Sequence, residues 1–117
     1  MNLRLGHTEV FVKDPMKSKE FYVDVLGFEL ITVQAEKYVW LKLGERNILL
    51  RPGTEKNTAV DYRHTNIAFV IYTDDVDGTV KQYTSKGLVF NGDDGPVNPT
   101  FTDLDGNWFQ LANPDAK

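Results

Sequence analysis

Apolar and polar residues alternate in several short stretches of the chain, and this pattern predicts β-strands. In the first stretch, residues 5–13, Val10 and Val12 lie on one face, opposite His7, Glu9 and Phe11. The same signal predicts further strands over residues 28–33, 38–43, 47–51, 64–72, 88–91, 100–102 and 108–112. A turn at residues 44–46 joins the third and fourth strands, and a turn at residues 103–106 joins the last two.

Helix signals occur twice. Asp14 can cap a helix whose first residue is Pro15, since a missing N–H costs nothing there. Apolar residues then recur at helical spacing, and Gly27 ends the helix. A second helix begins after Asp74 or Asp75 and ends at Gly87. The two helices are therefore predicted in matching places after their strands.

The order of these elements repeats. In each half, a helix-start signal follows seven positions after the first residue of a strand opening at His7 or Asn66, and a glycine ends the helix. Such a duplication predicts two βαβββ modules, residues 1–52 and 64–117, joined by a polar linker at 53–63. The fold class is α+β.

Helices must cover the apolar face of each sheet, so the other face is free for a ligand. Aromatic rings and a few polar groups gather on that face, as in many ligand pockets. Its predicted members are His7, Glu9, Phe11, Tyr38, Trp40, Lys42, Ile48, Leu50, Asn66, Ala68, Trp108 and Gln110. Trp40 and Trp108 on this face suit ligand stacking and a purely structural packing role about equally.

Composition narrows the function classes. The 117 residues carry a net charge of −4 with scattered basic residues, which argues against nucleic acid as a partner. No cysteine is present, so thiolate metal sites and thiol nucleophiles are excluded. No apolar run is long enough for a membrane span, and the first residues lack a signal-peptide core, so a cytoplasmic location is expected.

Three pieces of the chain resemble the vicinal oxygen chelate superfamily, which includes glyoxalase I, bleomycin-resistance proteins and extradiol dioxygenases. The first piece runs from His7-Thr8 through Asp14-Pro15 and Phe21-Tyr22 to Leu26-Gly27-Phe28. The others are Asn66-Ile67-Ala68-Phe69 and the turn Asp103-Leu104-Asp105-Gly106-Asn107 before Trp108. The resemblance implies a mixed sheet curved into a cup, with helices on its outer face, and a homodimer.

In metal-containing members of that superfamily, four strands each direct one ligand into the cup. The matching positions here are His7, Ile48, Asn66 and Gln110, and only His7 is a standard ligand for a divalent ion. Gln110 stands where the family usually has a glutamate, so His7 and Gln110 are the metal ligands if a metal binds at all. We expect no cofactor. A divalent metal is the alternative, because His7, Glu9 and His64 could together form a cluster of ligands.

The resemblance therefore predicts a protein that sequesters an apolar or aromatic ligand, with a cationic ligand as a further option given the negative charge. Its candidate ligand-binding residues are His7, Glu9, Phe11, Trp40, Ile48, Asn66, Trp108 and Gln110. A metal-dependent lyase, isomerase or dioxygenase is the alternative. A metal-free enzyme using His7 and Glu9 as an acid–base pair is a third option. The sequence names neither the ligand nor any catalytic residue.

Overall fold

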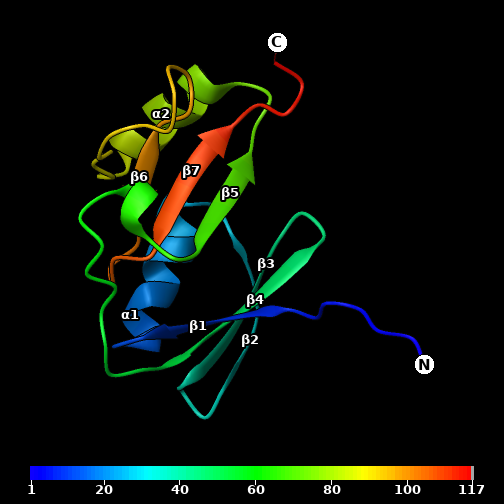
Figure 1. Ribbon diagram of the computed structural model, residues 1–117. Coiled ribbons are helices and arrows are strands. Elements are labelled where there is room, and N and C mark those ends of the chain that lie inside the picture. Colours follow the sequence, from blue (N-terminus) through cyan, green and yellow to red (C-terminus); the bar gives the residue numbers. More distant parts are fainter. Residues whose placement is uncertain (117) are drawn as a thin grey trace. The chain divides into compact units, whose positions relative to one another are not determined.

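The computed structural model describes residues 1–116, which form two compact units. The first unit spans Met1–Glu55, and the second begins at Lys56. Each unit has its own β-sheet and its own helix (Figure 1), which confirms the α+β class. Within residues 1–116, no helix has the length and apolar character that a membrane crossing requires.

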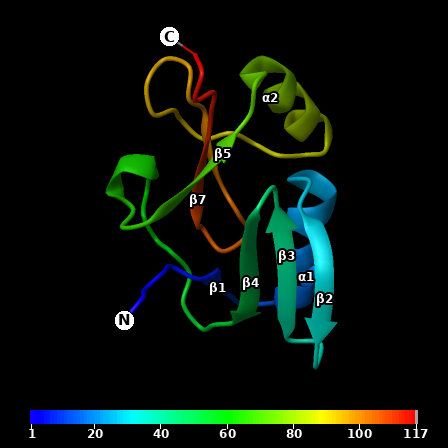
Figure 2. The same cartoon turned by 90° about the vertical axis from the view of Figure 1, so that its right-hand side faces the viewer.

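The first unit contains a four-stranded mixed sheet in the order β1-β4-β3-β2. Its strands are β1 (Thr8–Val12), β2 (Glu29–Gln34), β3 (Tyr38–Leu43) and β4 (Arg46–Pro52). Strand β1 runs parallel to β4, and the other pairs are antiparallel. Figure 2 shows β4, β3 and β2 side by side. The predicted strands 28–33, 38–43 and 47–51 are thus confirmed to within a residue or two.

The helix of the first unit begins as the sequence predicts. Asp14 accepts a hydrogen bond from the Lys17 N–H at 3.2 Å, and Pro15 is the first residue of α1 (Pro15–Glu20). The chain then continues as a π-helical turn, η1 (Phe21–Val25), which ends before Gly27 at φ +86°. The helix α1 packs against β3 and β4. It thereby covers one face of the sheet and leaves the other face for the candidate site.

The register of β4 corrects one predicted placement. Leu49 pairs with Glu9 on β1 and with Trp40 on β3, so these three side chains share a face. Ile48 and Leu50 point to the opposite face, with Val10 and Val39, and both are buried. The prediction that Ile48 and Leu50 share the face of His7 and Trp40 is therefore wrong. Three consecutive apolar residues, Ile48 to Leu50, hid the alternation of this strand.

The second unit contains a three-stranded sheet in the order β5-β7-β6, with β5 parallel to β7 and β6 antiparallel to it. Its elements are η2 (Tyr62–His64), β5 (Ala68–Tyr72), α2 (Val76–Ser85), β6 (Thr100–Thr102) and β7 (Trp108–Ala112). Figure 1 shows α2 beside β6, and the Tyr83 ring of α2 meets the Phe101 ring edge-on at 6.0 Å. Phe101 in turn stacks on Phe109 at 5.0 Å, and these rings form the core of this unit.

One predicted strand of the second unit does not form, and another is shorter than predicted. Residues 88–91 are not a strand, so this unit is βαββ and the predicted βαβββ order is wrong here. Only a local pairing remains, in which the Asn91 N–H donates to the Thr100 carbonyl at 2.8 Å. The strand predicted from residue 64 starts at Ala68, because Asp61 accepts hydrogen bonds from the His64 backbone and holds η2.

The predicted turn before the last strand is confirmed. The Asp103 carboxylate is buried and accepts hydrogen bonds from the backbone N–H groups of Asp105 and Asn107, each at 2.9 Å. Gly106 follows at φ +82°, a conformation that favours glycine. The turn fixes the start of β7 and therefore the direction in which Trp108 and Gln110 point.

Candidate functional site

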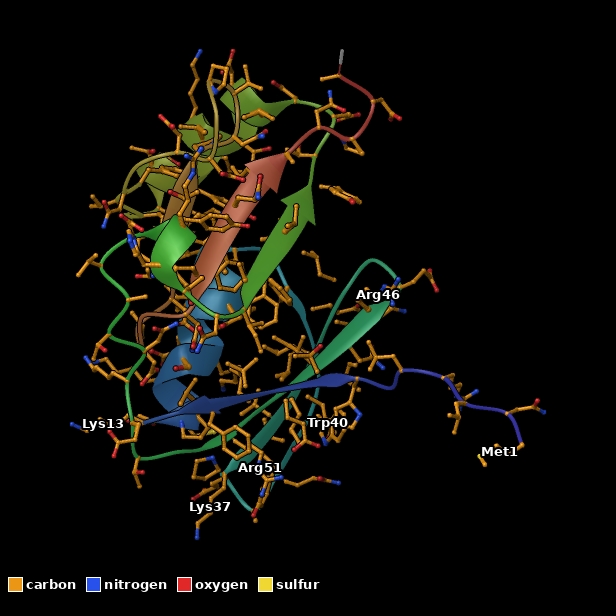
Figure 3. All side chains as sticks on the ribbon, viewed as in Figure 1. Met1, Lys13, Lys37, Trp40, Arg46 and Arg51 are labelled. Carbon is orange, nitrogen blue, oxygen red and sulfur yellow. The ribbon has the colours of Figure 1, made fainter. Side chains whose placement is uncertain are left out.

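Four side chains of the first unit form a connected group, which we call the His7 cluster: His7, Glu9, Trp40 and Arg51. His7 Nε2 lies 2.9 Å from Glu9 Oε2, and Arg51 Nη1 donates to Glu9 Oε1 at 2.8 Å. The rings of His7 and Trp40 meet at 4.5 Å between centroids, with an interplanar angle of 63°. Figure 3 labels Trp40 on β3 and Arg51 on β4, the strands that carry them.

Arg51 links this cluster to two further rings. Its guanidinium carbon lies 5.0 Å from the centroid of Phe11 and 5.5 Å from that of Tyr38, both within cation–π range. Its Nε is buried and has no hydrogen-bond partner among the described residues. Phe11 itself is half exposed, so its ring forms part of the unit's surface. The guanidinium is thus held by Glu9 and by two aromatic faces.

The electrostatics of the cluster favour an ionised Glu9. The hydrogen bond from Arg51, and next the bond to His7, lower the pKa of the Glu9 carboxyl below its usual range. About a third of each of the three polar side chains remains exposed, so water screens these interactions. Glu9 and Arg51 offset each other's charge, which leaves the cluster without a net charge when His7 is neutral.

The residues present do not fit a divalent metal ion well. Among residues 1–116, no group of three or more histidine, aspartate or glutamate side chains is arranged to hold one. In the first unit, the His7 nitrogen nearest Glu9 and both Glu9 oxygens already have hydrogen-bond partners. In the second unit, Asn66 and Gln110 are neutral amides, which cannot balance the charge of a divalent ion.

Two predicted site residues of the second unit, Trp108 and Gln110, are covered by the segment that precedes β5. Trp108 and Gln110 share a face of the sheet with Ala68, as predicted, and also with Val70. Residues 57–65, which we call the strap, cross this face. The Trp108 indole N–H donates to the Ala59 carbonyl at 3.2 Å, and the Gln110 amide donates to the Tyr62 hydroxyl at 2.7 Å. Trp108 is only 2% exposed as a result.

The strap has further attachments to its own unit. Asn57 donates its backbone N–H to the Asp105 carbonyl at 2.9 Å, and Arg63 pairs with Asp94 at 3.2 Å. Asp94 also accepts a hydrogen bond from the Gln110 amide at 3.2 Å. Gln110 is therefore tied to the strap and to the loop that follows α2. Trp108 is likewise buried and bonded to the strap.

The two remaining predicted residues lie apart from these contacts. Asn66 is exposed and sits in the bend before β5. His64 lies in η2, where its Nδ1 contacts Asp61 at 2.6 Å, and its side chain is 71% exposed. The His64 contact lowers the pKa of the Asp61 carboxyl. His64 is thus occupied by a partner within its own turn.

The sequence prediction missed three residues that organise these surfaces: Arg51, Tyr62 and Asp94. Arg51 follows three consecutive apolar residues that hide the alternation of β4, and only its pairing with Phe11 on β1 shows which face it lies on. Tyr62 begins the single turn η2 and Asp94 lies in a loop, and neither segment has a periodic pattern that indicates which way a side chain points.

The fold and motifs agree with comparisons to known proteins. Residues 4–111 match the family model of the Glyoxalase/Bleomycin resistance protein/Dioxygenase superfamily. Metallothiol transferase FosB of Staphylococcus haemolyticus is 30% identical over 115 residues, covering 92% of this chain and 81% of the relative. The FosB protein of Staphylococcus epidermidis is 31% identical over the same shares of the two chains.

Solved structures share the fold at lower identity. TnmS3, an antibiotic binding protein from Streptomyces sp. CB03234, has a TM-score of 0.69 and 23% identity, covering 97% of this chain and all of that one. FosX, a fosfomycin resistance protein from Listeria monocytogenes, has a TM-score of 0.76 and 19% identity, covering 95% and 91%. The chain therefore belongs to the Glyoxalase/Bleomycin resistance protein/Dioxygenase superfamily, as its motifs predicted.

Proposed function

We propose that this protein binds a small aromatic molecule without a metal ion, in the manner of the antibiotic-binding members of its superfamily. The observation that carries the proposal is the His7 cluster. There the metal-binding histidine position is bonded to Glu9, and Glu9 is neutralised by Arg51. The exposed aromatic surface beside it suits a ligand ring better than an ion.

The proposed contacts in the first unit are His7, Glu9, Phe11 and Trp40, with Arg51 added by the structure. Trp40 and His7 offer ring surfaces at 4.5 Å from each other. Arg51 changes the expected charge of the ligand. A cationic ligand would have to compete with Arg51 for Glu9, so we now favour a neutral ligand over the cationic option.

Trp108 and Gln110 of the second unit stay in the proposal as contacts that need the strap to open, and Asn66 stays as an exposed contact before β5. The Trp108 indole and the Gln110 amide are each held by one or two hydrogen bonds to residues 57–65 or to Asp94. Hydrogen bonds of this kind contribute about 0.5–1.5 kcal/mol each. A ligand that offers the same partners can replace them.

The experiment is a thermal-shift screen of aromatic compounds in the presence of EDTA. A ligand at about 100 times its Kd stabilises the folded state by about 2.7 kcal/mol, which is readily detected as a raised Tm. We expect stabilising compounds to be found with metal removed. Stabilisation that appears only when Mn²⁺, Ni²⁺ or Zn²⁺ is added would contradict the proposal.

A metal-dependent enzyme is the second candidate, and the sequence identity of 30–31% with metallothiol transferase FosB favours it. Elemental analysis of protein purified without a metal-affinity tag distinguishes the two. A stoichiometric divalent metal would support the enzyme, whereas a metal content near zero supports the binding protein.

We further propose that the protein acts in the cytoplasm as a homodimer. The dimer is supported by the superfamily resemblance and by apolar side chains exposed along β1 and β5, among them Phe11, Val70 and Tyr72. Both strands are edge strands of their sheets, with one side free for pairing. Light scattering tests the dimer.

A further inference from the structure

We propose that Glu9 and Arg51 hold His7 as a hydrogen-bond acceptor, so that its ligand is a neutral aromatic molecule bearing a hydroxyl or amino donor. This inference rests on the proposed function and adds the chemistry of the ligand. It also assigns Glu9 and Arg51 the part of positioning residues, which act through His7.

The partner of His7 determines which of its ring nitrogens donates a hydrogen bond and which accepts one. A neutral imidazole has one nitrogen that donates and one that accepts, and an ionised carboxylate only accepts. His7 Nε2 lies 2.9 Å from Glu9 Oε2, so Nε2 carries the proton. His7 Nδ1 has no partner among residues 1–116 and is the accepting nitrogen. A ligand that bonds to it must bring the hydrogen.

Arg51 stabilises the hydrogen bond between His7 and Glu9 in this one arrangement. It donates to the second oxygen of Glu9 at 2.8 Å and lies over the rings of Phe11 and Tyr38. With Arg51 on one oxygen, only the other oxygen faces His7. The ion pair with Arg51 favours an ionised Glu9, which only accepts, so the hydrogen bond runs from His7 Nε2 to Glu9.

The surroundings of His7 indicate the rest of the ligand. Trp40 and the half-exposed Phe11 offer aromatic surface, and rings favour edge-to-face or offset contacts of the kind His7 and Trp40 make. The charges of Glu9 and Arg51 are already paired. An anionic ligand would meet the Glu9 carboxylate, and a cationic one would meet Arg51, so a neutral donor fits best.

The second histidine provides an internal control, because its bonding is the reverse. His64 contacts Asp61 through Nδ1, at 2.6 Å, and the chain has only these two histidines. His64 should therefore carry its proton on Nδ1, while His7 carries it on Nε2. One spectrum can compare the two tautomers under identical conditions.

The first test is nitrogen-15 NMR of the imidazole rings at about pH 8.5, where a free imidazole is neutral. We expect His7 protonated on Nε2 and His64 protonated on Nδ1 in the ligand-free protein. A His7 that carries its proton on Nδ1, or that exchanges evenly between tautomers, would overturn the proposal without bearing on whether any ligand binds.

The variant Glu9→Gln sharpens this test. Arg51 should keep the amide oxygen, so the amide NH₂ would face His7 and move the His7 proton to Nδ1. The tautomer of His64 should not change, and the Trp108 indole signal in the second unit should report an unchanged fold. A His7 tautomer that is the same in both proteins would show that Glu9 does not set it.

Binding of three probes tests the ligand class, with the Trp40 indole N–H signal as the readout. The probes are 2-naphthol, 2-methoxynaphthalene and naphthalene-2-sulfonate. We expect 2-naphthol to bind about 2- to 13-fold more tightly than the methyl ether, the range for one hydrogen bond, and the sulfonate to bind most weakly. In Glu9→Gln the preference for 2-naphthol over the ether should disappear.

Equal binding of 2-naphthol and its ether to the wild-type protein, or tightest binding of the sulfonate, would overturn the assigned ligand class. So would the absence of binding by all three probes. These results differ from failure of the proposed function, which would appear as a thermal-shift screen with no stabilising compound unless a metal is added.

Discussion

At the scale of the residue, the core of the second unit depends on Phe101. Its ring is fully buried between Phe109, Tyr83 and Phe90, with centroid distances of 5.0, 6.0 and 5.5 Å. Phe101→Ala should lower the free energy of unfolding by about 3–5 kcal/mol, since it leaves a cavity among three rings. Urea unfolding followed by circular dichroism measures this loss.

The matched control is Leu104→Ala in the neighbouring turn. Leu104 is 43% exposed, so its truncation should change the stability by less than about 0.5 kcal/mol. If the two variants lose the same stability, Phe101 is not the core residue that its burial indicates.

Glu9 makes a pH-dependent contribution to stability. Its folded-state pKa is lowered, chiefly by the bond from Arg51, so its contribution is fully present above the usual glutamate pKa. The contribution should fade as the pH falls through the lowered value. The difference in Tm between wild type and Glu9→Gln should therefore be largest near neutral pH and shrink towards acid. A difference that grows towards acid would reverse this assignment.

For some residues the amino-acid sequence alone predicted the correct face of the strand, and for others it did not. Val10, Val12, Trp108 and Gln110 lie on the predicted faces, because Glu9 marks the face opposite Val10 and Val12 and the polar Gln110 marks its own face of β7. In β4, Ile48, Leu49 and Leu50 are all apolar and all buried, so only pairing with β1 and β3 shows that Leu49 and Arg51 share the face of Glu9.

At the scale of the element, the strap is bonded to two candidate site residues, Trp108 and Gln110. Tyr62→Phe removes the hydroxyl that accepts the Gln110 hydrogen bond at 2.7 Å. We expect a loss of about 1–3 kcal/mol, since Gln110 is buried, and faster quenching of Trp108 fluorescence by acrylamide.

Tyr72→Phe serves as the control for the strap, because Tyr72 is 69% exposed on the edge strand β5. It should change neither the stability nor the quenching measurably. Unchanged quenching in Tyr62→Phe as well would mean that the Tyr62 hydroxyl does not hold the strap over Trp108.

Gly106 joins the strap to the turn before β7. A Cβ there would lie 2.3 Å from the Asn57 carbonyl oxygen, and the backbone φ is +82°. Gly106→Ala should therefore destabilise by more than the roughly 1–2 kcal/mol expected of a left-handed residue alone.

Gly87→Ala isolates that backbone cost, since Gly87 has φ +98° with nothing within 4 Å of its Cβ position. Chemical denaturation of both variants compares them directly. Equal losses would show that the strap yields to the added methyl group at no cost.

The sequence predicted most elements, and the exceptions have local causes. The capping residues and the glycines that follow predicted both helices correctly. Asp14 and Asp75 each accept a backbone hydrogen bond from the first turn of their helix. The segment 88–91 reads as a strand from its apolar residues, but Val89 is 81% exposed and only Asn91 pairs with β6. The strap has no periodic pattern, so its packing could not be predicted.

At the scale of the whole molecule, we propose a homodimer, which the resemblance to the superfamily implies. Light scattering at micromolar concentration should give twice the 13.3 kDa mass of the chain. A stable mass of one chain under these conditions would contradict the dimer.

We propose above all that this member of the superfamily binds its ligand without a metal ion. The most direct measurement is an isothermal titration of one stabilising aromatic compound into the protein, once with EDTA and once with excess Mn²⁺. Metal-free binding predicts the same Kd in both titrations, within about twofold. Binding that vanishes in EDTA and returns with Mn²⁺ would contradict the claim and favour the metal-dependent enzyme.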